Sequence, residues 1–93
     1  MSITLRQLEV FVAVSEEGSI TRAGDALGLP QSSISTQLQD LEKALGLRLF
    51  DRHTRMLRLT EAGAEILPLA HKTLADLDAM VDGSAQLKTL ERG

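Results

Sequence analysis

The chain has 93 residues, of which 43% are hydrophobic, and a formal net charge of -3 at pH 7. This length suits one small domain with a modest core plus one appended element, and it disfavours a large enzyme active site. Only two aromatic residues, Phe11 and Phe50, are present, which excludes a surface that binds single-stranded nucleic acid by stacking bases on rings. The absence of cysteine excludes disulfides and thiolate metal sites, and it fits a reducing cytoplasm.

The acidic charge is concentrated in the last third of the chain. Residues 1–60 hold seven basic and seven acidic side chains, whereas residues 61–93 hold three basic and six acidic ones. Within the neutral part, one aspartate stands among four arginines, namely Arg48, Arg52, Arg55 and Arg58. A basic run of this kind is more often a solvated hairpin than a binding site, but beside a DNA-binding helix it would attract phosphates.

No segment is predicted to cross a membrane or to direct export. The longest uninterrupted apolar run, Val10 to Val14, is too short to span a bilayer. Arg6 and Glu9 stand where a signal peptide needs apolar residues. We therefore expect a soluble, cytoplasmic protein with no membrane partner.

Two helices with recognisable starts are predicted at the beginning of the chain. Thr4 and Gln7 provide both halves of a capping box for a helix over residues 5–17. Ser19 is an N-cap for a short second helix over residues 20–27. A glycine follows each helix and can take the left-handed conformation that ends it.

A third helix is predicted over residues 31–45, and its two faces differ in kind. One face is an apolar stripe with spacings of four, three and four residues, formed by Ile34, Leu38, Leu41 and Leu45. The opposite face of the first two turns carries only hydroxyl and amide side chains, namely Gln31, Ser32, Ser33, Ser35, Thr36, Gln37 and Gln39. Solvent-facing helices usually carry Lys and Glu, whereas Ser and Thr weaken a helix interior. These side chains therefore serve a purpose other than helix stability.

A small hairpin is predicted after the third helix. Leu47, Leu49 and Phe50 alternate as in a strand, and residues 56–59 form the returning strand. The basic run then lies at the tip of the hairpin, next to the third helix.

A long helix is predicted to start after Thr60 and to reach at least Val81. Apolar residues at heptad spacing form a seam along it: Leu67, Ala70, Leu74, Leu77 and Val81. Further apolar residues flank the seam, so part of this surface is expected to lie against the first helix of the same or the partner chain. A helix folded wholly onto its own domain is the alternative. More than twenty residues at ~1.5 Å each extend farther than so small a domain can cover, which favours pairing of two copies.

The elements together predict a mainly α fold. A winged helix-turn-helix of three helices and a two-stranded wing occupies residues 1–59. A linker helix that dimerises follows over residues 60–82, and residues 83–93 are expected to be a frayed C-terminal end.

The second and third helices have the pattern of a helix-turn-helix, in which a tight glycine-containing turn joins two helices. A helix fits the major groove of DNA, where hydroxyl and amide groups reach base edges and long charged side chains would hold the backbone away. Ser19 and Thr21 stand at the start of the second helix, which suits a DNA phosphate. Ser19 could equally be a plain N-cap, and Thr21 could simply be exposed.

On the hairpin, Arg52, His53 and Arg55 are expected to contact phosphates or the minor groove. Arg58 could instead pair with a carboxylate, and Arg48 is more typical of a structural residue.

Neither a metal site nor an enzyme active site is predicted. His53 and His71 are eighteen residues apart, with no cysteine and no close pair of carboxylates. No glycine-rich phosphate loop, nucleophile elbow or Ser/His/Asp constellation is present in the sequence.

The chain resembles the N-terminal DNA-binding domain of LysR-type transcriptional regulators, on the segments LRQLEVFVAVSEEGSITRAGDALGLPQSSISTQLQDLEKALGLRLFDR and LRLTEAG. The resemblance covers roughly residues 3–65 without gaps. It includes the family's LF-x-R signature, which begins at Leu49, and its LT-x-x-G signature, which begins at Leu59.

The resemblance implies more than the residues show. Members of the family act as dimers or tetramers at interrupted inverted repeats near promoters. They carry a C-terminal effector domain of two α/β lobes that binds a small molecule. That domain is not included in this sequence, so no cofactor is expected here.

Carried over by position, the resemblance assigns base contacts to Gln31, Ser32, Ser33, Ser35 and Thr36. It assigns backbone contacts to Gln37, Arg52 and the residues around Ser19.

Three residues depart from the family pattern. Pro30 replaces a usual capping Ser, so the recognition helix loses a side-chain cap, although Pro is tolerated in a first helical turn. Thr36 replaces a common Arg and shortens the reach into the groove. Gly24 replaces a usual Ala, at a cost of roughly 1 kcal/mol in helix propensity unless close packing requires it.

Two other interpretations remain open at this point. One is a winged helix of another class, with the same binding to DNA but no effector domain. The other is a winged helix that docks a protein partner through its third helix. The polar, uncharged face of that helix argues against the second, because protein interfaces centre on apolar and aromatic anchors.

Overall fold

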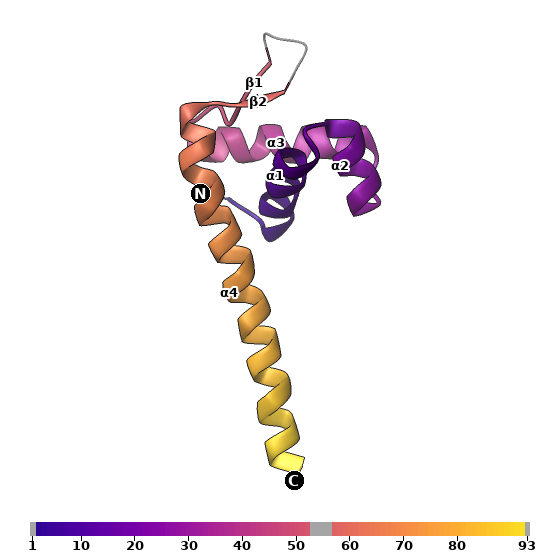
Figure 1. The fold of residues 1–93 in the computed structure, drawn as a ribbon, viewed down its shortest axis with the longest axis vertical. Coiled ribbons are helices and arrows are strands. Elements are labelled where there is room, and N and C mark those ends of the chain that lie inside the picture. The colour runs from indigo at the N-terminus through magenta and orange to yellow at the C-terminus, as the bar shows by residue number, and fades with distance from the viewer. Residues whose placement is uncertain (1, 53–56, 93) are drawn as a thin grey trace.

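The computed structural model describes residues 2–52 and 57–92. Its elements in chain order are α1 (Leu5–Glu17), α2 (Ile20–Leu27), α3 (Gln31–Leu45), β1 (Phe50–Asp51), β2 (Arg58–Leu59) and α4 (Glu61–Arg92). The predicted mainly α fold, with three helices, a two-stranded wing and a long final helix, is confirmed (Figure 1). The first three helices and the wing gather at one end of a molecule of 57 × 25 × 21 Å, and α4 projects from them as a rod.

The starts of α1 and α2 form as predicted. The Gln7 backbone N–H donates to Thr4 Oγ1 over 3.1 Å, and the Thr4 N–H donates to Gln7 Oε1 over 3.1 Å, which completes the capping box. Gly18 ends α1 with a φ of 67°, in the left-handed region that glycine adopts without strain. Ser19 Oγ then accepts the Arg22 N–H over 3.2 Å and starts α2.

The core lies where α1, α2, α3 and the first turns of α4 meet. The largest fully buried side chains are Phe11, Ile34, Leu38, Leu41, Leu49, Val10 and Val14. Phe11 of α1 meets Phe50 of β1 edge to face, with 5.6 Å between ring centroids and 79° between ring planes. The two aromatic residues of the chain thus tie the base of the wing to the helices.

Gly24 lies where α2 passes closest to the turn before α3. A Cβ at this position would lie 2.6 Å from the Leu29 carbonyl oxygen and 3.6 Å from a side-chain carbon of Ile34. Close packing therefore accounts for the glycine, as the sequence analysis allowed.

The strands of the wing are shorter than predicted. Each has two residues, paired antiparallel with Phe50 opposite Leu59 and Asp51 opposite Arg58. The expected strand over Leu47 and Leu49 does not form, because their N–H groups donate to Glu42 of α3, to its carbonyl oxygen and to its carboxylate respectively.

The long helix starts as predicted but extends beyond its expected end. Thr60 Oγ1 accepts the Gly63 N–H over 2.9 Å, so Thr60 caps α4. Gly83 and Ser84 do not begin a frayed end, since α4 continues through them to Arg92. One glycine costs a helix only about 1 kcal/mol, and the residues that follow it, from Ala85 to Leu87 and beyond, are mostly good helix formers.

Gly63 allows α4 to pass close to β2 and to Leu49, the residue before β1, which yields a testable prediction. A Cβ at Gly63 would overlap the Leu49 carbonyl oxygen and would lie 3.0 Å from Leu59 Cδ2. We expect Gly63→Ala to lower the free energy of unfolding by about 1–3 kcal/mol, as overpacking does elsewhere. Urea denaturation followed by circular dichroism measures this change.

Gly83→Ala is the matched control on the same helix. A Cβ there would meet nothing within 4 Å, so the change should leave stability unchanged or raise it by up to about 1 kcal/mol. Equal urea midpoints for Gly63→Ala and the parent chain would show that α4 does not lie so close to the wing.

Candidate nucleic-acid interface

The first two turns of α3 carry the residues predicted to contact bases. Gln31, Ser32 and Thr36 are exposed, and Ser33 and Ser35 are half-buried. Ile34 and Leu38, on the opposite face, are fully buried in the core. The structure thus brings the five predicted residues together on one exposed polar surface at the start of α3.

The turn between α2 and α3 has the tight geometry of a helix-turn-helix. Gly28 takes a left-handed φ of 68°, and the Leu29 N–H donates to the Gly24 carbonyl over 2.9 Å. Pro30 is the N-cap of α3 and makes no side-chain cap, as the sequence analysis expected. The first N–H groups of a helix form a positive end that suits an anion.

Ser19 and Thr21, at the start of α2, take the roles that were the alternatives to contact with a DNA phosphate. Ser19 is a helix cap, and Thr21 is exposed. Both remain available near the N-terminus of α2, so their contact with a DNA phosphate stays a prediction. Gln37, also predicted to contact the backbone, is half-buried on α3.

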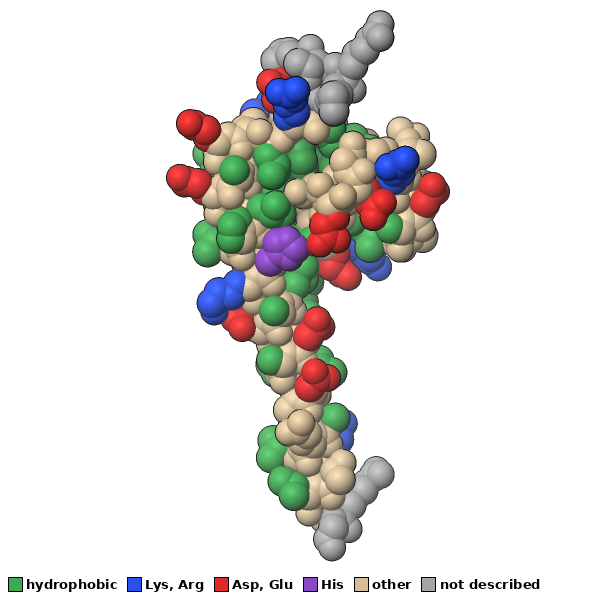
Figure 2. All heavy atoms as spheres, in the orientation of Figure 1, with side chains coloured by type: hydrophobic (Ala, Val, Ile, Leu, Met, Phe, Trp, Pro, Cys, Tyr) green, Lys and Arg blue, Asp and Glu red, His purple; other side chains and the backbone are tan. Residues whose placement is uncertain are grey.

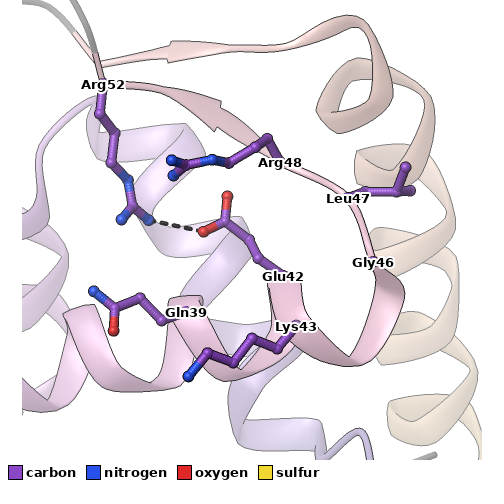
Figure 3. A pocket seen from close by; sticks show the side chains of 7 residues that line it. All are labelled: Gln39, Glu42, Lys43, Gly46, Leu47, Arg48 and Arg52. Carbon is purple, nitrogen blue, oxygen red and sulfur yellow. Dashed lines mark hydrogen bonds and ion pairs between the residues drawn. The ribbon is translucent and has the colours of Figure 1, made fainter.

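Arg52, the residue directly after β1, forms an ion pair with Glu42 of α3. Its Nη2 donates to Glu42 Oε1 over 3.0 Å, and its side chain is 31% exposed. Figure 3 shows Arg52 and Arg48 reaching toward Glu42 above α3. Phosphate contact by Arg52 stays a prediction, while His53 and Arg55 lie outside the described residues. Arg58 is exposed and stands opposite Asp51 in the wing.

Glu42, the residue that joins the wing to α3, was not predicted from the sequence as part of the site. Its side chain is only 8% exposed, and it accepts hydrogen bonds from both Leu49 and Arg52. The signal was present in the sequence. The helical period that predicted the burial of Leu38 and Leu41 also places position 42 on the buried face, where a carboxylate needs a partner.

An open hollow of about 610 Å³ lies between the wing and the second half of α3, lined by Gln39, Glu42, Lys43, Gly46, Leu47, Arg48 and Arg52 (Figure 3). Three cations and one buried carboxylate give it a positive balance, which suits a phosphate better than an apolar ligand. Among residues 2–52 and 57–92, no three His, Asp or Glu side chains gather as metal ligands.

The predicted dimer seam divides into two parts. Ala70 is 3% exposed and belongs to the domain core, and Leu67 packs against that core. The first turns of α4 therefore cover α1 of their own chain, one of the two placements expected. Leu74 and Leu77 are half-buried and outside the core cluster, and Val81 is 58% exposed.

The projecting part of α4 exposes large apolar side chains. Figure 2 shows hydrophobic side chains along the rod, where no other element covers them. The large hydrophobic residues of α4 that are exposed are Leu69, Met80, Val81, Leu87 and Leu90. This surface is what a helix left without its partner would present.

The three helices, the tight turn between α2 and α3 and the two-stranded wing define a winged helix-turn-helix domain with an added helix. The family model described as "Bacterial regulatory helix-turn-helix protein, lysR family" matches residues 5–64. The chain belongs to this family, and its first two thirds are the family's helix-turn-helix DNA-binding domain.

Named relatives agree with this assignment. The transcriptional regulator CfxR of Cupriavidus necator is 37% identical over 92 residues, which are 99% of this chain and 29% of that protein. The transcriptional activator CmpR of Synechocystis is 38% identical over 90 residues, which are 97% of this chain and 30% of that protein. The chain thus spans about three tenths of the length of these regulators.

Solved structures agree as well. The DNA-binding domain of BenM, in complex with DNA containing catB site 1, matches with a TM-score of 0.88 and 39% identity, over 91% of this chain and 96% of that one. Full-length BenM carrying the R156H mutation matches with a TM-score of 0.86, over 90% of this chain and 28% of that one.

Within the described ranges 2–52 and 57–92, no helix combines the length and apolar character that crossing a bilayer requires.

Proposed function

We propose that this chain binds double-stranded DNA in a sequence-specific manner, with the N-terminal half of α3 in the major groove. The observation that carries this proposal is the polar surface of hydroxyl and amide groups formed by the exposed Gln31, Ser32 and Thr36 and the half-buried Ser33 and Ser35. Side chains of this kind donate to and accept from base edges. The match to a BenM DNA-binding domain in complex with DNA supports DNA binding by this fold.

In the proposed complex, the wing and the start of α2 flank α3 and contact the sugar-phosphate backbone. The wing contributes Arg52, His53 and Arg55, and the start of α2 contributes Ser19 and Thr21. These contacts hold the helix in register without recognising sequence.

The part of the seam that lies outside the core, Leu74, Leu77 and Val81, pairs two copies, so that two α3 helices face the two halves of an interrupted inverted repeat. We further propose, as the family resemblance implies, that such a DNA-binding domain works together with a C-terminal domain that binds a small-molecule effector, and that the assembled regulator is a dimer or a tetramer. The protein works in the cytoplasm, where bacterial promoters lie, and it acts by binding alone, without catalysis.

A protein-docking role for α3 has less support. Its solvent-facing residues from Gln31 to Thr36 are polar, whereas protein interfaces are centred on buried aromatic and aliphatic anchors. The exposed apolar residues of the described chain lie mainly on α4 instead.

Selection of duplexes from a randomised pool tests the proposal. The chain should enrich a related set of sequences with two-fold symmetry, and fluorescence anisotropy should then give an affinity for the enriched duplex at least ~10³-fold above that for random duplex. Failure to enrich any sequence, with equal affinity for all duplexes, would contradict sequence-specific binding.

Arg55 in the wing yields a separate electrostatic prediction. Arg55→Gln should weaken binding to every duplex and should lower the slope of log affinity against log salt by about 0.9 if one phosphate contact is lost. Titrations at several salt concentrations measure the slope, with Arg6→Gln on the exposed surface of α1 as the control. A slope equal to that of the parent would place Arg55 away from the phosphates.

A further inference from the structure

The buried carboxylate of Glu42 uses both of its oxygen atoms to hold the wing. Oε2 accepts the Leu49 backbone N–H over 2.8 Å, and Oε1 accepts Arg52 Nη2 over 3.0 Å. The first bond fixes the chain as it enters β1, and the second fixes the first side chain after β1. One side chain on α3 therefore sets both the position of the wing and the direction of its first arginine.

Arg52 keeps the capacity to bind a second anion. A guanidinium has five N–H donors, and the ion pair with Glu42 involves its Nη2. The Arg52 side chain is 31% exposed at the rim of the hollow, which also holds Lys43 and Arg48. A DNA phosphate that approached this rim would compete with Glu42 for the same cation.

We propose that Glu42 is a positioning residue that holds Arg52 away from the phosphates of duplexes that α3 does not recognise, and that Arg52 reaches a phosphate only when the base contacts of α3 seat the wing on the preferred duplex. The proposal rests on the proposed function, since it needs a domain that binds DNA. It assigns a role in specificity to a residue outside the surface of α3 that contacts bases.

Affinity for random duplex and affinity for the preferred duplex have different physical origins. Binding to random duplex comes almost wholly from cations that neutralise phosphates, whereas binding to the preferred duplex adds base contacts. The pairing of Arg52 with Glu42 removes one phosphate contact from binding to random duplex and leaves the base contacts of α3 intact. Because Arg52 reaches a phosphate only on the preferred duplex, its pairing with Glu42 lowers the affinity for random duplex more than the affinity for the preferred duplex, and the ratio of the two affinities rises.

Glu42→Gln is the decisive variant. Glutamine has nearly the same size and keeps an oxygen that can accept the Leu49 N–H, but it removes the charge that binds Arg52. Affinity for random duplex should rise, and the salt dependence should steepen by about 0.9 as one more phosphate is contacted. A fourfold reduction in salt would then raise the affinity about 3.5-fold more than it does for the parent. The ratio of preferred to random affinity should fall.

Two further variants distinguish the release of Arg52 from a general change of charge or structure. Asp40→Asn removes the same charge from an exposed position on α3 and leaves the Glu42–Arg52 pair intact, so its salt slope should equal that of the parent. In the Arg52→Gln background, adding Glu42→Gln should not steepen the slope, because the freed cation is absent.

The outcomes are distinct. If the parent chain binds all duplexes equally or none, the proposed function fails. If the parent discriminates but Glu42→Gln keeps its salt slope, or if the steepening persists without Arg52, the role of Glu42 is overturned.

Should Glu42→Gln not fold, NMR of the Arg52 side-chain N–H signals in the parent chain decides the question. These signals should stay unchanged on titration with random duplex, and a shift on binding would contradict the proposal.

Discussion

Replacing Leu77 by aspartate should convert a dimeric chain into a folded monomer, and Leu74→Asp should do the same. Both leucines lie on α4 beyond the residues that pack against the core, and outside the core cluster, so the winged domain does not need them to fold. In a paired seam each would face its counterpart, and a carboxylate buried there without a partner is strongly unfavourable.

The loss of pairing should have a large effect on DNA binding. Two linked recognition helices bind two half-sites with an avidity that exceeds single-site affinity by roughly 10²–10⁴-fold. The affinity of Leu77→Asp for an inverted repeat should therefore fall by a factor in this range, toward the affinity of one half-site. Affinity for a duplex that contains a single half-site should change little.

Analytical ultracentrifugation together with anisotropy on both duplexes measures these effects. Ala79→Asp is the matched control, because it adds the same charge to an exposed position two residues away and off the seam. A Leu77→Asp chain that stays dimeric at micromolar concentration, or a parent chain that is already monomeric there, would place the interface elsewhere.

Replacing Gln31 by alanine should cost about 1–3 kcal/mol of binding free energy against the preferred duplex and much less against random duplex. Gln31 is exposed at the first position of α3, where a side chain reaches deepest into a groove. Ser35→Ala should show the same selectivity, with a smaller loss because its half-buried hydroxyl has a shorter reach.

Gln39→Ala is the control for helix structure, since it makes the same change two turns farther along α3. Its effect should be equal on preferred and random duplexes. Equal losses on the two duplexes for Gln31→Ala would show instead that this side chain does not recognise sequence.

Local sequence signals predicted the helices well. Thr4 with Gln7 and Ser19 set the starts of α1 and α2, and both signals act within four residues, so they do not depend on the rest of the fold. The polar surface of α3 could be predicted for a similar reason, because the period of one helix fixes which residues share a face.

Two features were missed, one at the end of α3 and one on α4. The alternation of Leu47 and Leu49 predicted a strand, but their N–H groups bond to Glu42 within seven residues, at the C-terminal end of α3. The seam of α4 was predicted as one surface, yet Ala70 is buried in the core of its own domain. The burial of Ala70 does not follow from local pattern, since it depends on which element packs against α4.

The most direct test of sequence recognition by α3 is to remove the major-groove acceptors of the DNA. Replacing the purines of the enriched duplex by 7-deazapurines deletes the N7 acceptors and leaves the minor groove and the phosphates unchanged. Binding should weaken when purines are replaced at two half-sites about one helical turn apart. With the Gln31→Ala variant, replacing the purine of the base pair that Gln31 contacts should cause no additional loss. Binding that is unaffected by 7-deazapurines at every position would contradict major-groove recognition by α3.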